Sequence, residues 1–327
     1  MSLAELPILE ETRHRLHHRL RDEHISFQEL APLVEMDAAL CLNLQRHAVR
    51  INPDCLHQIT GAANCLSLIG FKEVVRLVKR LPIVSAKTEV EEEKLYRLML
   101  HNAAYAGTLN ACLSAMKQSN NQATAKWSGM LASAPLWIWI LKEPAARNWI
   151  YYLTLGQEAT TASRMVFGQA IKEWQRLAMR LALPPLAMEF WKPDHWPTVR
   201  QWQSLRKLDP RDAEPKPNRE LIHLCQQPAI SLICANLLAV HTMALPFGKT
   251  FQRWLSITAN MLGKPEPVLY SQLRQAMLSI AFQQQSAYGS GVYYWLSPAA
   301  TQLPISLWIP KQEDKQIQPL SKSKPQT

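Results

Sequence analysis

Apolar residues recur at helical spacing along most of this chain of 327 residues. Ile8, Leu9, Thr12, Leu16 and Leu20, for example, share one face at about 100° per residue, the period of an amphipathic helix. Such patterns predict helices at 8–20, 26–34, 37–48, 60–69, 71–81, 90–116, 124–133, 145–154, 158–182, 220–244, 248–262 and 266–284. Alternation typical of strands appears only at 292–296 and 305–309, which we expect to pair as a small hairpin. The predicted fold class is all-α.

Polar residues mark where several of these helices begin. Ser26 and Glu29 have the spacing of a capping box, in which the serine accepts a free backbone N–H and the glutamate reaches back to the cap. Asp37 is predicted to cap the next helix. The acidic run at 91–93 suits the positive end of a helix dipole.

Glycine is scarce, at 10 of 327 residues, against about 7 % in average proteins. Glycine-rich phosphate-binding loops are therefore disfavoured. The segment FGKT at 247–250 ends like such a loop, but Met243 stands where the motif requires another glycine. The motifs HExxH, GxSxG and GxGxxG are also missing from the sequence. No established catalytic motif is present.

The six cysteines form no CxxC pair and lie in apolar stretches, which predicts buried free thiols in a reducing compartment. The most apolar run, 127–141, is 15 residues long and contains Pro135, whereas a membrane helix needs about 20 residues. The N-terminal residues carry no signal-peptide pattern. We expect a cytoplasmic protein that makes no membrane contact.

The net charge of +10 raises the question of nucleic-acid binding. Residues 1–100 are nearly balanced, with 13 basic and 14 acidic side chains, so the surplus lies in residues 101–327. It is spread thinly there, with no Lys/Arg run longer than two residues and no basic stripe with interleaved aromatics. Nucleic acid therefore stays an alternative partner rather than the favoured one.

Three histidines lie close together on the first predicted helix. His14, His17 and His18 have i, i+3, i+4 spacing, which places two imidazoles on one exposed face. The arginines around them would repel a metal cation. A solvated polar face is the simplest interpretation, and an anion-binding or pH-sensitive patch is the alternative.

Several short segments together resemble a known family. They are LP at 6–7, SFQELA at 26–31, MDAAL at 36–40, ITGAANCLSLIG at 59–70, LHNAA at 100–104, WSGML at 127–131 and LALPP at 181–185. In order and spacing this series resembles the HDOD family, bacterial regulatory proteins related to the HD phosphohydrolases. The resemblance implies an N-terminal helical lobe packed on an HD-like helical bundle.

The resemblance also implies that the catalytic centre is lost. HD hydrolases hold metal ions that activate water and bind phosphate, through a histidine, an adjacent His-Asp pair and later ligands. By resemblance His101, followed by Asn102, takes the first position. Ala132 and Ser133 stand where the His-Asp pair should be, and Ile171 stands where a later histidine is common. These residues imply no metal, no cofactor and no enzymatic activity, but they could line a degenerate ligand pocket.

The resemblance and the composition suggest a division of the chain. We expect an N-terminal lobe at 1–85, a degenerate HD-like lobe at 86–205, a charged proline-rich loop at 206–219 and packing helices at 220–285. An irregular tail should occupy 286–327, disordered from about 311. All 11 tryptophans lie at or after Trp127, which indicates separate packing units before and after that point.

The function implied is that of a non-enzymatic bacterial regulator in signal transduction, a pseudoenzyme that acts by binding an unidentified signalling or regulatory protein. Two alternatives stay open. One is a nucleic-acid-binding regulator that uses the diffuse positive charge. The other is a sensor of a small ligand, such as a nucleotide, in the degenerate pocket, with the tryptophan-rich lobe as a further candidate pocket.

Overall fold

The computed structural model describes residues 5–22, 24–143, 145–168, 170–192, 196–212 and 216–284. α-Helices dominate these residues, which confirms the predicted all-α class. The predicted hairpin at 292–296 and 305–309, and the predicted tail at 286–327, lie outside the described part of the chain.

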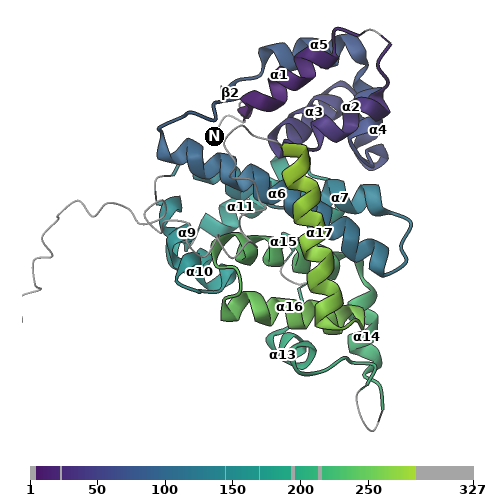
Figure 1. Ribbon diagram of the computed structural model, residues 1–327, viewed down its shortest axis with the longest axis vertical. Coiled ribbons are helices and arrows are strands. Elements are labelled where there is room, and N and C mark those ends of the chain that lie inside the picture. Colours follow the sequence, from purple (N-terminus) through teal and green to yellow (C-terminus); the bar gives the residue numbers. More distant parts are fainter. Residues whose placement is uncertain are drawn as a thin grey trace, which may run out of the picture.

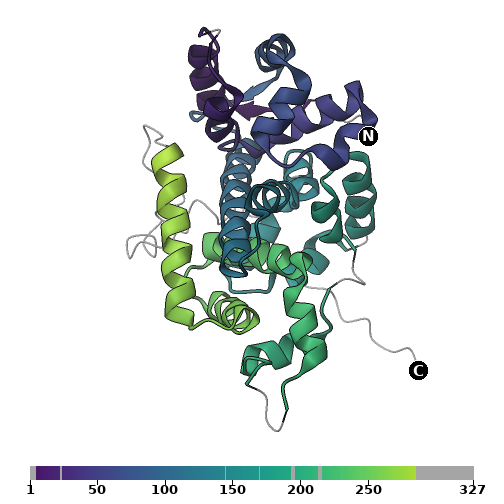
Figure 2. The ribbon, with the colours of Figure 1, turned by 90° about the vertical axis from the view of Figure 1, so that its right-hand side faces the viewer.

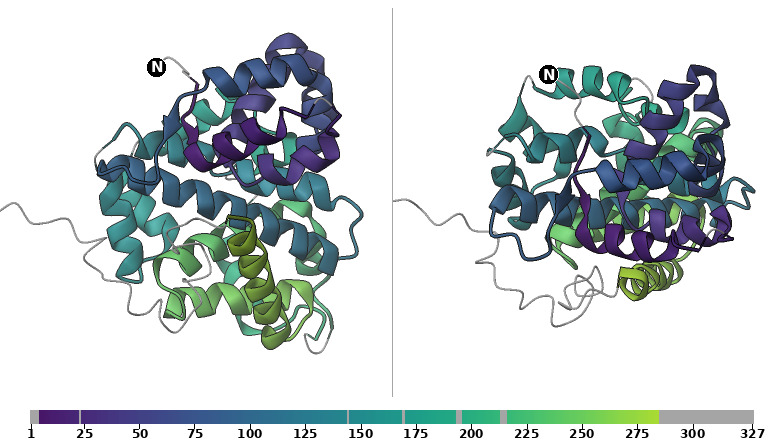
Figure 3. Two further views of the ribbon diagram at one scale, coloured as in Figure 1. Left: turned by 45° about the horizontal axis from the view of Figure 1, so that its top comes forward. Right: turned by 90° about the horizontal axis from the view of Figure 1, so that it is seen from above.

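The N-terminal elements form one end of the molecule (Figure 1). They are β1 (Ile8–Leu9), α1 (Glu10–Arg19), α2 (Phe27–Val34), α3 (Ala38–Ile51), the 3-10 helix η1 (Pro53–Gln58), α4 (Ala62–Ile69), α5 (Phe71–Arg80) and β2 (Ile83–Val84). Seen from above, these helices lie over the rest of the fold (Figure 3), and α3 packs on the first two helices of the following bundle.

The bundle is built around the long helix α6 (Glu91–Met116), which packs on α7 (Gln122–Leu131). After them come α8 (Ala134–Ile140), α9 (Ala146–Thr154), α10 (Ala159–Phe167), α11 (Ala170–Arg180), α12 (Pro185–Glu189) and α13 (Val199–Lys207). The last described helices are α14 (Arg219–Gln226), α15 (Pro228–Ala244), α16 (Lys249–Leu262) and α17 (Glu266–Gln284). Helices α15 and α17 both lie against α6 (Figure 2).

The predicted helix at 8–20 begins two residues too early. Ile8 and Leu9 form a short strand that pairs in parallel with Ile83 and Val84. Both residues are fully buried, as the apolar pattern requires. A short apolar run cannot distinguish a buried strand from a helix turn, because the partner that decides it lies far away in the sequence.

Proline and glycine divide two of the predicted helices. The helix predicted at 158–182 is interrupted at Gly168, whose φ of 45° is a left-handed conformation. The helix predicted at 220–244 breaks before Pro228, which then starts α15. Helices α8, α12 and α13 were not predicted from the sequence. The first two carry proline in their first turn, where it favours a helix start, and α13 includes the first two residues of the loop predicted at 206–219.

The predicted caps are confirmed. Ser26 and Glu29 form the full capping box of α2. The Asp37 carboxylate caps α3 by accepting the N–H of Leu40 at 3.0 Å, and its other oxygen accepts the N–H of Leu9 at 2.6 Å. Asp37 is fully buried. One side chain therefore both starts a helix and fixes the strand that precedes α1.

Two other sequence expectations can be compared with the described residues. All six cysteines are free, and Cys112 alone among them is only partly buried. No single described helix has the length and apolarity to cross a membrane, and the one bent pair that passes by length and composition, α14 with α15, turns by 72°.

Two glycines allow α6 and α7 to touch backbone to backbone. A Cβ added at Gly107 of α6 would lie 2.7 Å from the carbonyl oxygen of Lys126, and one added at Gly129 of α7 would lie 2.8 Å from Asn110 Cβ. Both separations are shorter than van der Waals contact. Glycine is required at this crossing for space.

Replacing Gly129 with alanine should separate the two helices. Alanine improves helix propensity by about 1 kcal/mol, but we expect the clash to outweigh this gain and lower the free energy of unfolding by about 1–3 kcal/mol. Urea denaturation followed by circular dichroism would measure the change. Gly61→Ala is the matched control, because the nearest atom to its added Cβ is 3.8 Å away, and it should change stability by about 1 kcal/mol or less. A Gly129→Ala protein as stable as the wild type would contradict the close-contact argument.

Candidate functional site

The positions that the family resemblance assigns to a metal site are used for packing in this structure. Asn102 is buried in α6 and donates from Nδ2 to the carbonyl oxygen of Ala239 on α15 at 2.7 Å. This bond fixes α15 against α6. The Asn102 side chain therefore has a structural partner within the described residues.

His101 lies beside a partly buried ion pair. Its ring is half-buried and its Nδ1 has no hydrogen-bond partner among the described residues. Burial, together with the positive charge of Arg97, lowers the pKa of His101 to about 4, against the opposing effect of Glu11. Glu11 is held by Arg97 through two hydrogen bonds of 2.7 and 3.1 Å. The His101 imidazole is therefore neutral at neutral pH. The Glu11 carboxylate, which would favour its protonation, is already paired with Arg97.

The two positions expected for a His-Asp pair each accept a hydrogen bond from a tryptophan side chain. The carbonyl oxygen of buried Ala132 accepts the Nε1–H of Trp191 at 2.8 Å. Ser133 Oγ accepts the Nε1–H of Trp137, also at 2.8 Å. Ile171 belongs to α11, but its side chain lies outside the described part of the structure. Among the described residues, no group of three or more His, Cys, Asp or Glu side chains is arranged to hold a metal ion.

The histidines of α1 all face solvent. His14, His17 and His18 are exposed, and His14 Nε2 lies 3.7 Å from Glu10 Oε1. Glu10 also accepts a hydrogen bond from Ser85 at 2.6 Å, which lowers the pKa of that carboxyl group. The anion-binding or pH-sensitive patch suggested by the sequence stays a prediction.

A cavity of about 400 Å³ is lined in part by residues of α15, and tryptophans form much of its wall. Trp149, Trp174, Trp191 and Trp196 line it, together with Phe190. Of the five positions assigned by the family resemblance, Ser133 is the one that the described lining includes. The other described positions among the five (His101, Asn102 and Ala132) are not part of that lining.

Edge-on contacts between rings hold this wall in place. The centroid of Trp174 lies 6.1 Å from that of Trp191, with the rings at 87°. Phe190 makes similar contacts, at 5.4 Å with Trp191 and 5.3 Å with Trp196. Such edge-to-face geometry is favoured by the charge distribution of aromatic rings. The wall is therefore a preformed aromatic surface.

A few polar groups interrupt the aromatic wall. The Nε1–H of Trp174 is buried and unpartnered among the described residues. Asn236 donates from Nδ2 to the carbonyl oxygens of Gly129 and Leu232. Arg164 is the only charged side chain in the described lining; it is exposed and forms no ion pair there.

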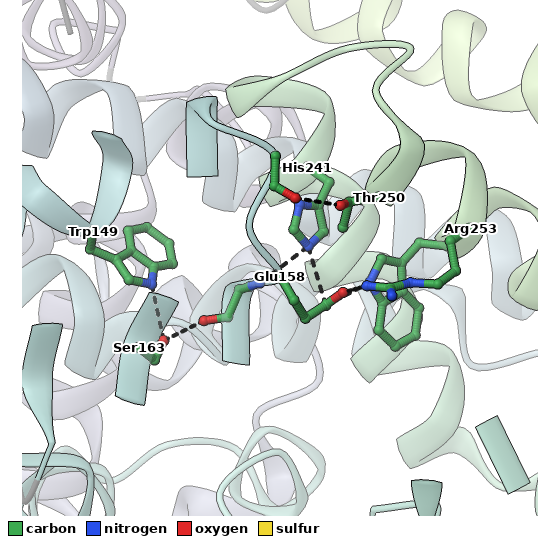
Figure 4. A network of polar contacts seen from close by, with 9 residues as sticks. Trp149, Glu158, Ser163, His241, Thr250 and Arg253 are labelled. Carbon is green, nitrogen blue, oxygen red and sulfur yellow. Dashed lines mark hydrogen bonds and ion pairs between the residues drawn. The ribbon is translucent and has the colours of Figure 1, made fainter. Parts of the chain in front are cut away.

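A polar network supports the cavity from behind (Figure 4). Ser163 accepts the Nε1–H of Trp149 at 3.0 Å and donates to the carbonyl oxygen of Ala159 at 2.7 Å. Glu158, which directly precedes Ala159, forms an ion pair with Arg253 and accepts the Nε1–H of Trp254 at 2.8 Å. This network links α10 to α16.

His241 of α15 belongs to the same network. Its Nε2 lies 3.4 Å from Glu158 Oε1 and 3.4 Å from the backbone nitrogen of Ala159. Burial lowers the pKa of His241 to about 4. Glu158 does not reverse this direction because Arg253 already balances its charge.

A second cavity, of about 330 Å³, is basic in character. Arg46, Arg50 and His47 line it from α3 and Arg180 lines it from α11, with Glu5 as the acidic member of the described lining. Burial lowers the pKa of Arg46, partly offset by Glu5. The sequence showed no basic run here because Arg180 lies at least 130 residues after the three α3 side chains.

Only part of the tryptophan cavity had a signal in the sequence. The concentration of tryptophans after Trp127 indicated an aromatic packing unit. It did not identify which four would share one wall, because the break at Gly168 that turns α11 back was not predicted. The polar network around Glu158 had no sequence signal at all.

His241 should make stability depend on pH. Its pKa is about 4 when folded and about 6.5 when unfolded, so protonation favours the unfolded chain. The stabilisation is complete above about pH 6.5 and is lost as the pH falls towards 4. Between pH 6.5 and 4.5 we expect the wild type to lose about 2–3 kcal/mol more than His241→Gln, measured by urea denaturation at each pH. Equal losses in the two proteins would mean that His241 is already protonated beside Glu158.

Comparison with known proteins identifies a similar solved structure and a family. The chain resembles, at 18 % identity and a TM-score of 0.54, the crystal structure of the MmoQ response regulator from Methylococcus capsulatus str. Bath, with 84 % of this chain and 99 % of that chain covered. This likeness shows a shared fold. No curated protein matches the chain. The family model of the HDOD domain matches residues 6–171, half of the chain, and the protein therefore belongs to the HDOD domain family.

Proposed function

We propose that this protein is a non-catalytic regulatory protein of a bacterial cytoplasm, which acts by binding another signalling protein. The observation that carries the proposal is the replacement of metal-ligand positions by packing contacts. Ala132 and Ser133 accept hydrogen bonds from the indoles of Trp191 and Trp137. Neither a methyl group nor an engaged hydroxyl is a competent ligand for a divalent metal.

The family and the structural neighbour support the regulatory part of the proposal. HDOD domains are generally non-catalytic relatives of HD hydrolases, and the neighbour is itself described as a response regulator. That neighbour is covered over 99 % of its length. The described residues include no group of three or more His, Cys, Asp or Glu side chains that could hold a metal ion and activate water, which supports output through protein contacts.

Hydrolytic activity provides the first test. We expect no phosphodiesterase activity towards bis(p-nitrophenyl) phosphate with Mn²⁺ above that of buffer, and no difference between the wild type and His101→Ala. Elemental analysis of the purified protein should find no stoichiometric transition metal. Hydrolysis that is present in the wild type and abolished by His101→Ala would overturn the non-catalytic assignment.

The second test addresses the partner. The tagged full-length protein would be recovered from lysate of its native host, with half of the sample treated with nuclease and both halves analysed by mass spectrometry. We expect a small set of proteins, present in near-stoichiometric amounts and resistant to nuclease. Loss of those proteins with nuclease would contradict binding through protein contacts.

Nucleic-acid binding is the second candidate, and the basic cavity is the observation that favours it. Arg46 and Arg50 of α3 converge there with Arg180 of α11. If this surface binds phosphates, affinity for DNA or RNA should fall steeply with salt as counterions are displaced. Arg50→Gln should then reduce the salt dependence, whereas Arg176→Gln, an exposed change on α11 outside that cavity, should have less effect.

A further inference from the structure

We propose that the tryptophan cavity is a binding site for a small planar aromatic compound that carries one negatively charged group. This site is a property of the folded chain alone and does not depend on which protein partner the regulator recognises. The proposal combines the size of the cavity, the shape of its wall, one unpartnered buried donor and the single cation in its described lining.

The cavity has the size and lining of a small-molecule site. Its volume of about 400 Å³ lies within the range of about 300–1,000 Å³ that is common for ligand pockets. Its described wall is mostly apolar, with a few polar groups, which is the usual composition of such sites. A ligand of one or two fused rings with a short substituent would occupy it.

The wall favours aromatic over aliphatic ligands. Trp174, Trp191 and Phe190 already meet at steep angles, between 70° and 87° for the adjacent pairs. A further ring placed among them would continue the same edge-to-face packing. Edge-to-face packing of a ligand ring adds binding free energy beyond that from burial of apolar area, which is all that an alkyl chain provides.

Two buried polar groups indicate that the ligand carries polar atoms. Trp174 is only 4 % exposed, and its Nε1–H has no partner among the described residues. An unpartnered buried donor is costly, and an acceptor oxygen on the ligand would relieve that cost. Asn236, 4 % exposed, offers a carbonyl oxygen that could accept a hydrogen bond from the ligand.

Arg164 sets the charge of the ligand. It is exposed, it forms no ion pair with other described residues, and it is the only charged side chain in the described lining. One guanidinium can hold one carboxylate, by two parallel hydrogen bonds. A nucleotide with several phosphates would need more donors than this wall supplies, so we infer an aromatic carboxylate rather than the nucleotide considered from the sequence.

Calorimetric titration of the full-length protein would test the class of ligand. The probes are 2-naphthoate, its uncharged analogue 2-naphthalenemethanol, and decanoate as an aliphatic acid. We expect saturable one-to-one binding of 2-naphthoate, binding of the alcohol that is weaker by about two- to fivefold because it lacks the ion pair, and still weaker binding of decanoate.

Two pairs of variants locate the binding site. Trp174→Phe keeps an aromatic ring at this position but removes the N–H donor. It should weaken the binding of both naphthalene probes by about two- to tenfold. Its control is Trp139→Phe, because Trp139 also has a buried, unpartnered Nε1 among the described residues but does not line the cavity. Arg164→Gln should weaken only 2-naphthoate, bringing it to the affinity of the alcohol. Arg176→Gln, exposed on α11 and outside the lining, should leave both affinities unchanged.

Each other outcome would overturn the proposal. Absence of saturable binding of 2-naphthoate, or equal effects of Trp174→Phe and Trp139→Phe, would exclude the cavity as the site. Tighter binding of decanoate would exclude the aromatic class. Displacement of 2-naphthoate by a cyclic dinucleotide would favour a nucleotide ligand. None of these results depends on partner recovery or hydrolysis, so this inference and the proposed function can fail separately.

Discussion

The contact between α6 and α7 through Gly107 and Gly129 is the constraint on which the bundle depends. Because neither glycine has a side chain, the two helix backbones meet directly. The crossing places the end of α7, and with it Ala132, where the Ala132 carbonyl oxygen accepts the Nε1–H of Trp191. A wider crossing would move that end away from Trp191, and the wall of the cavity would lose one of its supports.

The fate of the HD positions follows from the same packing. In an HD hydrolase they would face a hydrated metal centre, which needs charged ligands and open coordination sites. Here Ser133 and the backbone of Ala132 serve as acceptors for indoles, and Asn102 fastens α15 to α6. Polar groups have been kept where a buried donor needs a partner. The aromatic cavity, whose described lining includes Ser133, lies next to these positions and is mostly apolar.

The sequence predicted those parts of the fold that are decided locally. The capping box at Ser26 and the cap at Asp37 are set by residues three positions apart, and both are confirmed. The strand at Ile8 and Leu9 was not predictable, because its partner lies 75 residues away. The aromatic cavity was anticipated as a pocket somewhere in the tryptophan-rich lobe, without the residues that line it. The partly buried Glu158 network that supports it joins residues as far apart as 158 and 254.

The pairing of β1 with β2 has a consequence for how such a chain can change over evolutionary time. Ile8 lies opposite Ile83 and Leu9 opposite Val84, so the entry and the exit of the N-terminal helical segment are one strand spacing apart, about 5 Å. A segment whose two ends meet can be gained, lost or exchanged by recombination with little displacement of the chain on either side. The short strand pair therefore makes the N-terminal helices transferable as one block between otherwise different helical proteins.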